Sequence, residues 1–401
     1  MDEKEAIENH RWRVNICLSG KCDRGCHHCL ANGSMNGGSF FTLEQAYILA
    51  KNVKKFVDTL NDRKIDLRLG FACTGNGEIM LNSQYPQIFD VFFNIASDVE
   101  ARIVTSGVDS NEEEQRLLEI LSRPYAKKLE WYLSFNLFQS GFPKRLVRTL
   151  KLFFENGVDK VMIKITQAPQ DVYGAIRKLN RIIEGYFAKW IREVRPLIIS
   201  LDTDFVPVDF SKSTEQMMLD LFDGNLSPNP DISSRNLQAT LKNVRSPTRE
   251  TLGGLFVHLN TNFDRAFRFE TRYGEKKIVY APQHLIKRGR AATLKNVRWR
   301  FPDIKTPCRY LRSTEEKTSP IHIGSDGFYY PSCDCPSVEE MRIGHIKDDI
   351  SSMLSSFYVL HRLLLFCMIK DNQWYDDICD HCIHVMQRLR NQKFLSEIGI
   401  A

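Results

Sequence analysis

Short segments in which apolar and polar residues alternate recur along the first half of the chain, separated by segments with a helical repeat of apolar residues. Strict alternation places every second side chain on one face, as in a strand that is buried on that face. A capping box at 42–45 predicts the start of a helix that runs to about residue 60. Strands are predicted at 14–18, 65–71, 99–106, 129–136 and 158–166, and further helices at 143–156 and 172–183.

The order of these elements, strand followed by helix, predicts an α/β fold with a parallel sheet or a partial barrel. Two segments compete for the sixth strand, namely 197–205 and 276–280. The second of these also reads as one arm of a hairpin with 266–273, around Gly274. Residues 224–250 are rich in Ser, Asn and Pro, which predicts a loop.

The 11 cysteines are concentrated in two regions, near the start and near the end of the chain. An odd number of cysteines in a chain with no signal peptide argues against a disulfide framework and favours metal binding or catalysis. Cys22, Cys26 and Cys29 have the spacing C-x3-C-x2-C. Three thiolates on one short loop would bind three irons of a cubane cluster and leave the fourth iron open to a chelating ligand. The alternative is a zinc knuckle with His27 or His28 as the fourth ligand.

Small and polar residues follow the predicted strands at their carboxyl ends, where βα barrels place their chemistry. Gly75, Asn76 and Gly77 follow the second strand and would let the backbone approach a ligand closely. The adjacent Glu78 carboxylate could accept a hydrogen bond from an ammonium group. The fourth predicted strand also ends in polar residues, Ser134 and Asn136.

The last third of the chain carries six further cysteines. A hairpin is predicted at 322–331, with Asp326-Gly327 at its turn. Four of the cysteines form a plausible four-thiolate set, which suits electron relay or structure because no iron stays open, and a zinc ribbon is the alternative. The ligand candidates are Cys308, Cys333, Cys379 and Cys382, with Cys335 as a substitute for Cys333.

The motif of Cys22, Cys26 and Cys29 resembles the signature of the radical S-adenosylmethionine (radical SAM) superfamily. The resemblance implies a 4Fe–4S cluster whose fourth iron is chelated by the amino and carboxylate groups of S-adenosylmethionine. It implies a one-electron reductive cleavage that releases a 5′-deoxyadenosyl radical, which abstracts hydrogen from a substrate C–H bond in an oxidation, epimerisation or cross-linking. The fold it implies is a partial (β/α)6 TIM-like barrel followed by a small cysteine-rich α+β domain.

Several other residues match positions of that family. His28 precedes the third cysteine, where the family often has an aromatic residue in contact with adenine. The segment Gly75-Asn76-Gly77-Glu78 resembles the Gly-Gly-Glu motif that contacts the amino group of S-adenosylmethionine, with Asn76 in place of the middle residue. Gly289-Arg290-Ala291 resembles the junction after the last barrel strand, which favours 276–280 as that strand. Ser134 and Asn136 would bond the ribose hydroxyls, and Cys73 and Cys335 are candidates for hydrogen return in an epimerase-type reaction.

The C-terminal region resembles the auxiliary-cluster domains of radical SAM enzymes, the SPASM type and its shorter twitch version. The matching features are the spacing from the hairpin to the next cysteine and the Ile-Gly-x-Ile segment at 343–346. Six cysteines favour a single auxiliary 4Fe–4S cluster. The resemblance divides the chain into a barrel core at 1–210, an insertion or linker at 211–300 that could include the last barrel strand, and an auxiliary-cluster domain at 301–401.

Charge and hydropathy limit the expected partners. The chain has 55 basic and 49 acidic residues, and the resulting charge of +6 is too modest to argue for nucleic acid. Six cations without an acid lie in 287–300, where a solvated face is the ordinary explanation and an acidic peptide, a phosphate, RNA or the carboxylate of S-adenosylmethionine are alternatives. The polar N-terminus and the lack of a long apolar run predict a cytoplasmic protein without membrane contact. The family resemblance adds a small-molecule or peptide substrate and a flavodoxin- or ferredoxin-type electron donor. The alternative functions are radical chemistry on RNA or protein, and a non-catalytic zinc protein that binds RNA.

Overall fold

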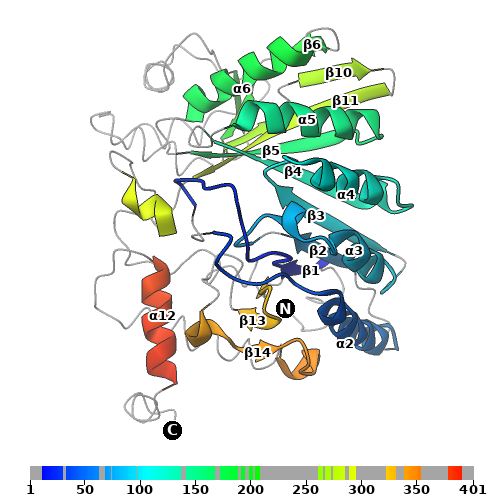
Figure 1. The fold of residues 1–401 in the computed structure, drawn as a ribbon, viewed down its shortest axis with the longest axis vertical. Coiled ribbons are helices and arrows are strands. Elements are labelled where there is room, and N and C mark those ends of the chain that lie inside the picture. Colours follow the sequence, from blue (N-terminus) through cyan, green and yellow to red (C-terminus); the bar gives the residue numbers. More distant parts are fainter. Residues whose placement is uncertain are drawn as a thin grey trace.

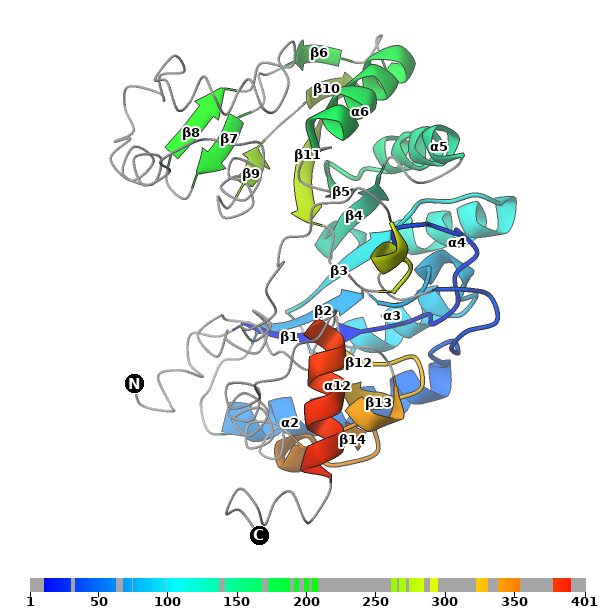
Figure 2. The ribbon, with the colours of Figure 1, turned by 90° about the vertical axis from the view of Figure 1, so that its left-hand side faces the viewer.

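The structure of the chain is a computed structural model, which describes separate segments between residues 11 and 390. The described segments form a large sheet with helices packed on it (Figure 1) and a separate three-stranded sheet (Figure 2). The described residues are 11–29, 33–62, 68–73, 75–96, 98–136, 141–167, 172–187, 191–194, 198–201, 204–207, 261–264, 267–271, 274–284, 289–294, 322–330, 338–353 and 378–390.

Six parallel strands form the centre of the large sheet, in the order β1-β2-β3-β4-β5-β11. The five strands predicted in the first half of the sequence are therefore confirmed, and neighbours in sequence are neighbours in the sheet. The strands are β1 (Arg11–Ile16), β2 (Arg68–Cys73), β3 (Val99–Thr105), β4 (Leu129–Phe135), β5 (Lys160–Gln167) and β11 (Gly274–His284).

Helices connect these strands and cover one face of the sheet (Figure 2). The helix α2 (Leu43–Asp62) begins at the predicted capping box, where the Gln45 amide donates to Thr42 Oγ1 at 3.1 Å and the Thr42 amide donates to Gln45 Oε1 at 2.7 Å. This alternation of strands and helices confirms the predicted α/β class. The other helices are α3 (Tyr85–Phe93), α4 (Asn111–Leu121), α5 (Phe142–Glu155) and α6 (Val172–Phe187), with the 3-10 turns η1 (Ile79–Leu81) and η2 (Ala126–Lys128).

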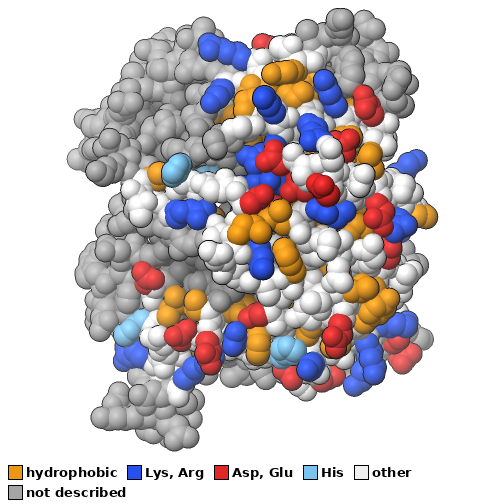
Figure 3. Space-filling model, viewed as in Figure 1, with side chains coloured by type: hydrophobic (Ala, Val, Ile, Leu, Met, Phe, Trp, Pro, Cys, Tyr) orange, Lys and Arg blue, Asp and Glu red, His pale blue; other side chains and the backbone are white. Residues whose placement is uncertain are grey.

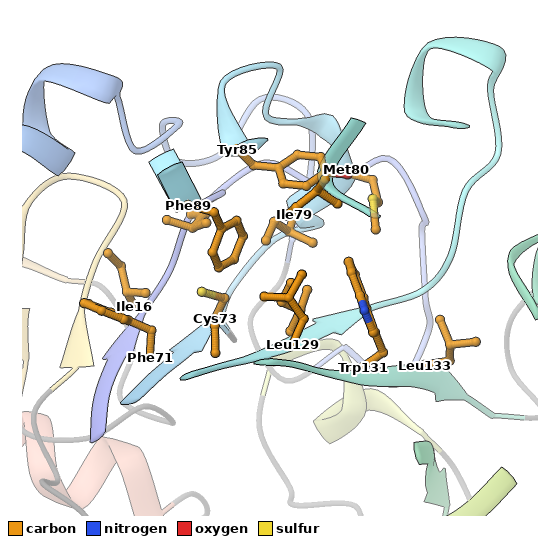
Figure 4. Packing of buried hydrophobic residues seen from close by; sticks show 14 of the residues in the cluster. Ile16, Phe71, Cys73, Ile79, Met80, Tyr85, Phe89, Leu129, Trp131 and Leu133 are labelled. Carbon is orange, nitrogen blue, oxygen red and sulfur yellow. The ribbon is translucent and has the colours of Figure 1, made fainter. Parts of the chain in front are cut away.

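The core lies between the parallel strands and these helices (Figure 4). Phe71 of β2 stacks on Phe92 of α3 with 4.3 Å between ring centroids, and Trp131 of β4 packs on Phe153 of α5 at 4.8 Å. Along β3 and β4 every second residue is buried on this side, as the alternating sequence predicts. The residues between them are less buried and lie on the opposite face of the sheet.

The sixth parallel strand is β11, which pairs with β5 and contains the segment 276–280. The competing segment 197–205 is not part of this sheet. Its residues contribute to two antiparallel strands of the three-stranded sheet, β7 (Ile198–Leu201) and β8 (Asp204–Pro207), next to β9 (Thr261–Asp264). The predicted hairpin around Gly274 is confirmed by β10 (Phe267–Thr271), which pairs antiparallel with β11 and also with β6 (Ile191–Val194).

The predicted hairpin at 322–331 extends the sheet beyond β1. Its strands are β12 (His322–Ile323) and β13 (Phe328–Tyr330), and β12 lies parallel to β1. Gly327 at the turn has φ +82°, a left-handed conformation that glycine adopts without a steric penalty. The Asn52 amide of α2 donates to the carbonyl of Ile346 at 2.7 Å, so the segment that follows the hairpin is anchored to the first helix. The remaining elements here are η5 (Glu339–Met341), β14 (Gly344–His345) and α12 (Ile378–Leu389).

Candidate functional site

The cysteines of the C-x3-C-x2-C motif lie on the loop that follows β1, at the carboxyl end of the parallel strands. Their thiols are half-buried and form no disulfide. Contacts within the loop fix its path: the Cys22 amide donates to the Ser34 carbonyl at 3.1 Å, the Cys29 amide to the Cys26 carbonyl at 3.2 Å, and the Gly33 amide to Cys29 Sγ at 3.3 Å. We call residues 17–29 and 33–41 the cysteine loop.

The thiols of this loop influence one another electrostatically. Burial, together with the nearby acidic groups of Glu78, Cys26 and Cys29, raises the pKa of Cys22 to about 12, although a hydrogen bond with the backbone of Arg24 acts to lower it. Because a thiol must lose its proton to bind a metal, binding at this loop releases protons. Within the described ranges, no group of three His, Cys, Asp or Glu side chains is arranged to hold a metal ion. A cubane cluster takes one thiolate per iron.

The glycine-rich turn after β2 packs directly against the cysteine loop. The Glu78 amide donates to the Lys21 carbonyl at 2.9 Å. A methyl group at Gly77 would collide with the Lys21 carbonyl, and one at Gly33 would lie 2.7 Å from the carbonyl oxygen of Asn76. The cysteine loop and the glycine-rich turn, which are far apart in sequence, thus contact each other through their backbones. Glycine permits this close approach because it has no side chain. The predicted site residues Gly75, Asn76 and Gly77 all lie in this contact.

The Glu78 carboxylate is buried and bonded within the protein. Its Oε1 accepts from Thr105 Oγ1 at 2.5 Å and from the Met80 amide at 3.2 Å. Its Oε2 accepts from the Ser106 amide at 2.8 Å and from Ser106 Oγ at 2.5 Å. A carboxylate has about four acceptor positions, and four donors of the protein occupy them. Glu78 therefore anchors the turn to the end of β3 through protein donors, and its predicted contact with an ammonium group stays a prediction.

Arg24, between the first two cysteines, is a residue that the sequence did not single out. Its side chain is 2% exposed and donates through Nη2 to both carboxylate oxygens of Glu113, at 2.9 Å each. Nε donates to Ser106 Oγ at 2.9 Å and Nη2 also to the Gly107 carbonyl at 3.1 Å. Burial acts to lower the pKa of Arg24, but the carboxylates of Glu78 and Glu113 outweigh it, so its pKa lies above the ordinary value.

Arg290 contacts the cysteine loop from the opposite end of the sheet. It lies in the 3-10 turn η4 (Gly289–Thr293) after β11, and it donates through Nε to the Cys26 carbonyl at 2.9 Å and through Nη1 to the Gly33 carbonyl at 3.0 Å. Its Nη2 atom is buried and has no hydrogen-bond partner in the described part of the chain. Burial, followed by the charges of Arg290 and His27, lowers the pKa of His28 to about 4, so His28 is neutral at pH 7.

The two polar residues predicted at the end of β4 differ in their exposure. Ser134 is half-buried on the face of the sheet away from the helices, opposite Lys164 of β5 in the strand register. Asn136 is 2% exposed and follows the strand directly. On the same face, Arg102 lies over the ring of Tyr132 at 4.7 Å. This face therefore presents polar and charged side chains.

The remaining cysteine candidates fall into two groups. Cys73 is 3% exposed, and its thiol packs in the core among Phe71, Phe89 and Leu129 (Figure 4). Burial raises the pKa of its thiol, and its position on the helix side of β2 places it on the face of the sheet opposite to Ser134 and Arg102. Cys382 is buried on α12. The other proposed auxiliary ligands, namely Cys308, Cys333, Cys335 and the side chain of Cys379, lie outside the described residues.

The surface and the helices give two further observations. Acidic and basic side chains are interspersed over the described face in Figure 3, which agrees with the nearly balanced charge of the chain. Among the helices of the described segments, none combines the length and the apolar character that crossing a bilayer requires.

Comparisons with known proteins gave structural similarities alone. No family model and no curated protein matches the chain. The solved structure of anSMEcpe with bound AdoMet superposes with a TM-score of 0.43 and 12% identity, over 96% of this chain and 98% of that one. Streptococcus suis SuiB bound to S-adenosylmethionine gives a TM-score of 0.43 and 12% identity, over 96% and 75% of the two chains. BtrN in complex with AdoMet and 2-DOIA gives 0.35 and 11%, over 88% and 85%.

Proposed function

We propose that this chain is a radical SAM enzyme in which Cys22, Cys26 and Cys29 hold a 4Fe–4S cluster that binds S-adenosylmethionine at its fourth iron. The observation that carries the proposal is the packing of the glycine-rich turn against the three-cysteine loop, at the carboxyl end of a parallel sheet. When bound, the cluster and its ligand supply reductive cleavage to a 5′-deoxyadenosyl radical, which takes hydrogen from a substrate C–H bond.

The residues at the carboxyl end of the parallel strands suit a 4Fe–4S cluster with bound S-adenosylmethionine. The donor set consists of the three half-buried thiols of the motif, because the fourth cysteine of the loop, Cys17, is buried and its thiol is bonded to the Ser19 carbonyl and the Asn76 amide. Three thiolates would leave one iron of a cubane open. Gly33 and Gly77 keep side chains out of the contact between the two loops, so backbone groups can approach a ligand. The buried Nη2 of Arg290 is a cationic donor next to the loop, and we assign it the carboxylate of S-adenosylmethionine.

The face of the sheet that the helices leave open is the proposed substrate face. Arg102 pairs with Glu130 at 3.2 Å there and lies over Tyr132, so a polar metabolite or a peptide finds both charges and an aromatic ring. We extend the proposal to an auxiliary 4Fe–4S cluster held by Cys308, Cys333 or Cys335, Cys379 and Cys382, which relays electrons or anchors substrate. A flavodoxin- or ferredoxin-type protein would donate the electron.

The direct test is anaerobic. The protein is reconstituted with iron and sulfide, mixed with dithionite and S-adenosylmethionine, and assayed for 5′-deoxyadenosine. Replacement of Cys22, Cys26 and Cys29 by Ala should abolish the product. Cys73→Ala, which removes a thiol outside the loop, should leave it, because this thiol packs in the core.

Metal analysis decides between this proposal and the zinc protein. Iron and sulfide bound in wild type and lost in the triple variant support the cluster. Stoichiometric zinc at the loop, in protein that stays colourless under argon, would refute it. Cys379→Ala should keep 5′-deoxyadenosine formation at least in part while blocking substrate turnover.

A further inference from the structure

We propose that Arg24 is a positioning residue that fastens the cysteine loop to the end of β3 and the start of α4 before any cofactor binds. This inference deepens the function proposed above and rests on it for the identity of the ligand. It assigns a specific task to a residue within the motif but not among its thiols.

The first argument is the number of elements that Arg24 joins. Its side chain starts between Cys22 and Cys26 and reaches Glu113 on α4 with two bonds of 2.9 Å. The same guanidinium bonds Ser106 Oγ at 2.9 Å and the Gly107 carbonyl at 3.1 Å, just beyond β3. One side chain thus fixes the loop to two elements that are more than 80 residues away in sequence.

The second argument is the link that Ser106 makes to the glycine-rich turn. Ser106 Oγ accepts from Arg24 and donates to Glu78 Oε2 at 2.5 Å, and the Ser106 amide donates to the same oxygen at 2.8 Å. Arg24 Nε lies 4.0 Å from Glu78 Oε2. Arg24 and Glu78 therefore both bond Ser106. This shared partner fixes the position of the cysteine loop relative to the glycine-rich turn.

The third argument is burial. The side chains of Arg24, Glu78 and Glu113 are 2%, 4% and 3% exposed. A charge in such a place is stable only while its partners stay in position, so the arrangement resists any displacement of the loop. Arg148 of α5 offers a contrast: it bonds Glu114 of α4 at 2.6 Å but is 34% exposed, and its hydrogen bonds within the described residues go to Asp109, Asn111 and Glu114, not to the cysteine loop.

Hydrogen–deuterium exchange of the metal-free protein tests the proposal. The amides of Cys22 and Glu78 donate to carbonyls of Ser34 and Lys21, and they report whether the loop and the turn stay together. Arg24→Met should speed their exchange by about tenfold or more, because local opening becomes easier. Arg148→Met should leave both amides unchanged, and Arg24→Lys should restore part of the protection.

The proposal can still be tested if the Arg24→Met variant fails to fold. In that case, Arg24→Met combined with Glu113→Gln carries the same measurement, because it also removes the buried charge of Glu113, while Glu78 keeps its hydrogen bonds from Thr105, Ser106 and Met80. Unchanged exchange of both amides in either variant, with the core helices still protected, would overturn the proposal.

A second readout separates positioning from simple stabilisation. In reconstituted protein, the change that S-adenosylmethionine produces in the paramagnetic resonance spectrum of the reduced cluster gives its affinity. Arg24→Met should weaken that affinity by about tenfold while the iron content stays unchanged, and Arg148→Met should not. Equal affinity in wild type and Arg24→Met would count against positioning. If no cluster forms in wild type, the proposed function fails, and the exchange experiment still decides whether Arg24 fastens the loop.

Discussion

The contact between the cysteine loop and the glycine-rich turn predicts a specific effect of one added methyl group. In Gly77→Ala the new Cβ would collide with the carbonyl oxygens of Ser19 and Lys21 and lie 2.8 Å from the Lys21 nitrogen. All three atoms belong to the backbone, so no side-chain rotation can relieve the collision. The turn must move away from the loop, and the hydrogen bond from the Glu78 amide to the Lys21 carbonyl must lengthen or break.

The magnitude follows from these two effects. Overpacking a well-packed site costs about 1–3 kcal/mol, and the net loss of a hydrogen bond about 1 kcal/mol. Gly77→Ala should therefore lower the free energy of unfolding by about 2–4 kcal/mol, measured as a shift of the urea transition of the metal-free protein. Gly185→Ala is the matched control, because this exposed glycine of α6 has nothing within 4 Å of the added methyl. It should raise the free energy of unfolding by about 0.5–1 kcal/mol through helix propensity.

The amount of iron that each variant binds should change in parallel with the position of the glycine relative to the cysteine loop. Displacement of the turn disturbs the backbone next to Cys22, so Gly77→Ala should bind less iron after reconstitution, and Gly185→Ala should bind as much as wild type. A Gly77→Ala protein with wild-type stability and a wild-type iron content would show that the two loops do not touch as the structure has them.

Three further predictions concern other parts of the fold. Arg290→Met removes two hydrogen bonds to carbonyls of the cysteine loop and should lower iron retention under chelator challenge, with the circular dichroism spectrum unchanged. Trp131→Ala opens a cavity against α5 and should lower the free energy of unfolding by about 3–5 kcal/mol, whereas Tyr47→Ala on the exposed face of α2 should change it by less than about 0.5 kcal/mol, both from urea titrations. Thr42→Ala removes the side-chain acceptor of the Gln45 amide and should cost about 1 kcal/mol, measured in the same way.

The parts of the fold that the sequence predicts are those with local causes. Strand alternation depends on residues two apart, and the capping box of α2 on residues three apart, so both are visible in a short window. The meeting of the cysteine loop and the glycine-rich turn is predictable for a related reason. Their strands β1 and β2 are parallel neighbours, and loops after parallel neighbours emerge at the same edge of the sheet.

The parts that could not be predicted depend on distant partners. Nothing near Arg24 in the sequence indicates Glu113, which lies 89 residues further on. The same holds for Glu78: its motif suggests a ligand contact, but its burial depends on hydroxyl donors at the end of β3. A strand of two residues such as β12 is too short to show alternation, so its place beside β1 emerges only in three dimensions.

The place of β12 shows how the cysteine loop is held at its base by the protein's own backbone. The strand β1, from which the loop emerges, is flanked on one side by β2 and on the other by β12, and the Cys17 amide donates to the Ile323 carbonyl at 2.8 Å. Above this base, the Asn82 side chain donates to the carbonyls of Leu18 and Phe41 at 2.7 and 2.9 Å, at the start and the end of the loop. The loop is thus closed at its base by neutral hydrogen bonds and held further out by Arg24 and Arg290. Because all of these contacts are made by the protein's own groups, folding meets part of the entropy of ordering the loop, which the proposed cluster would otherwise have to supply.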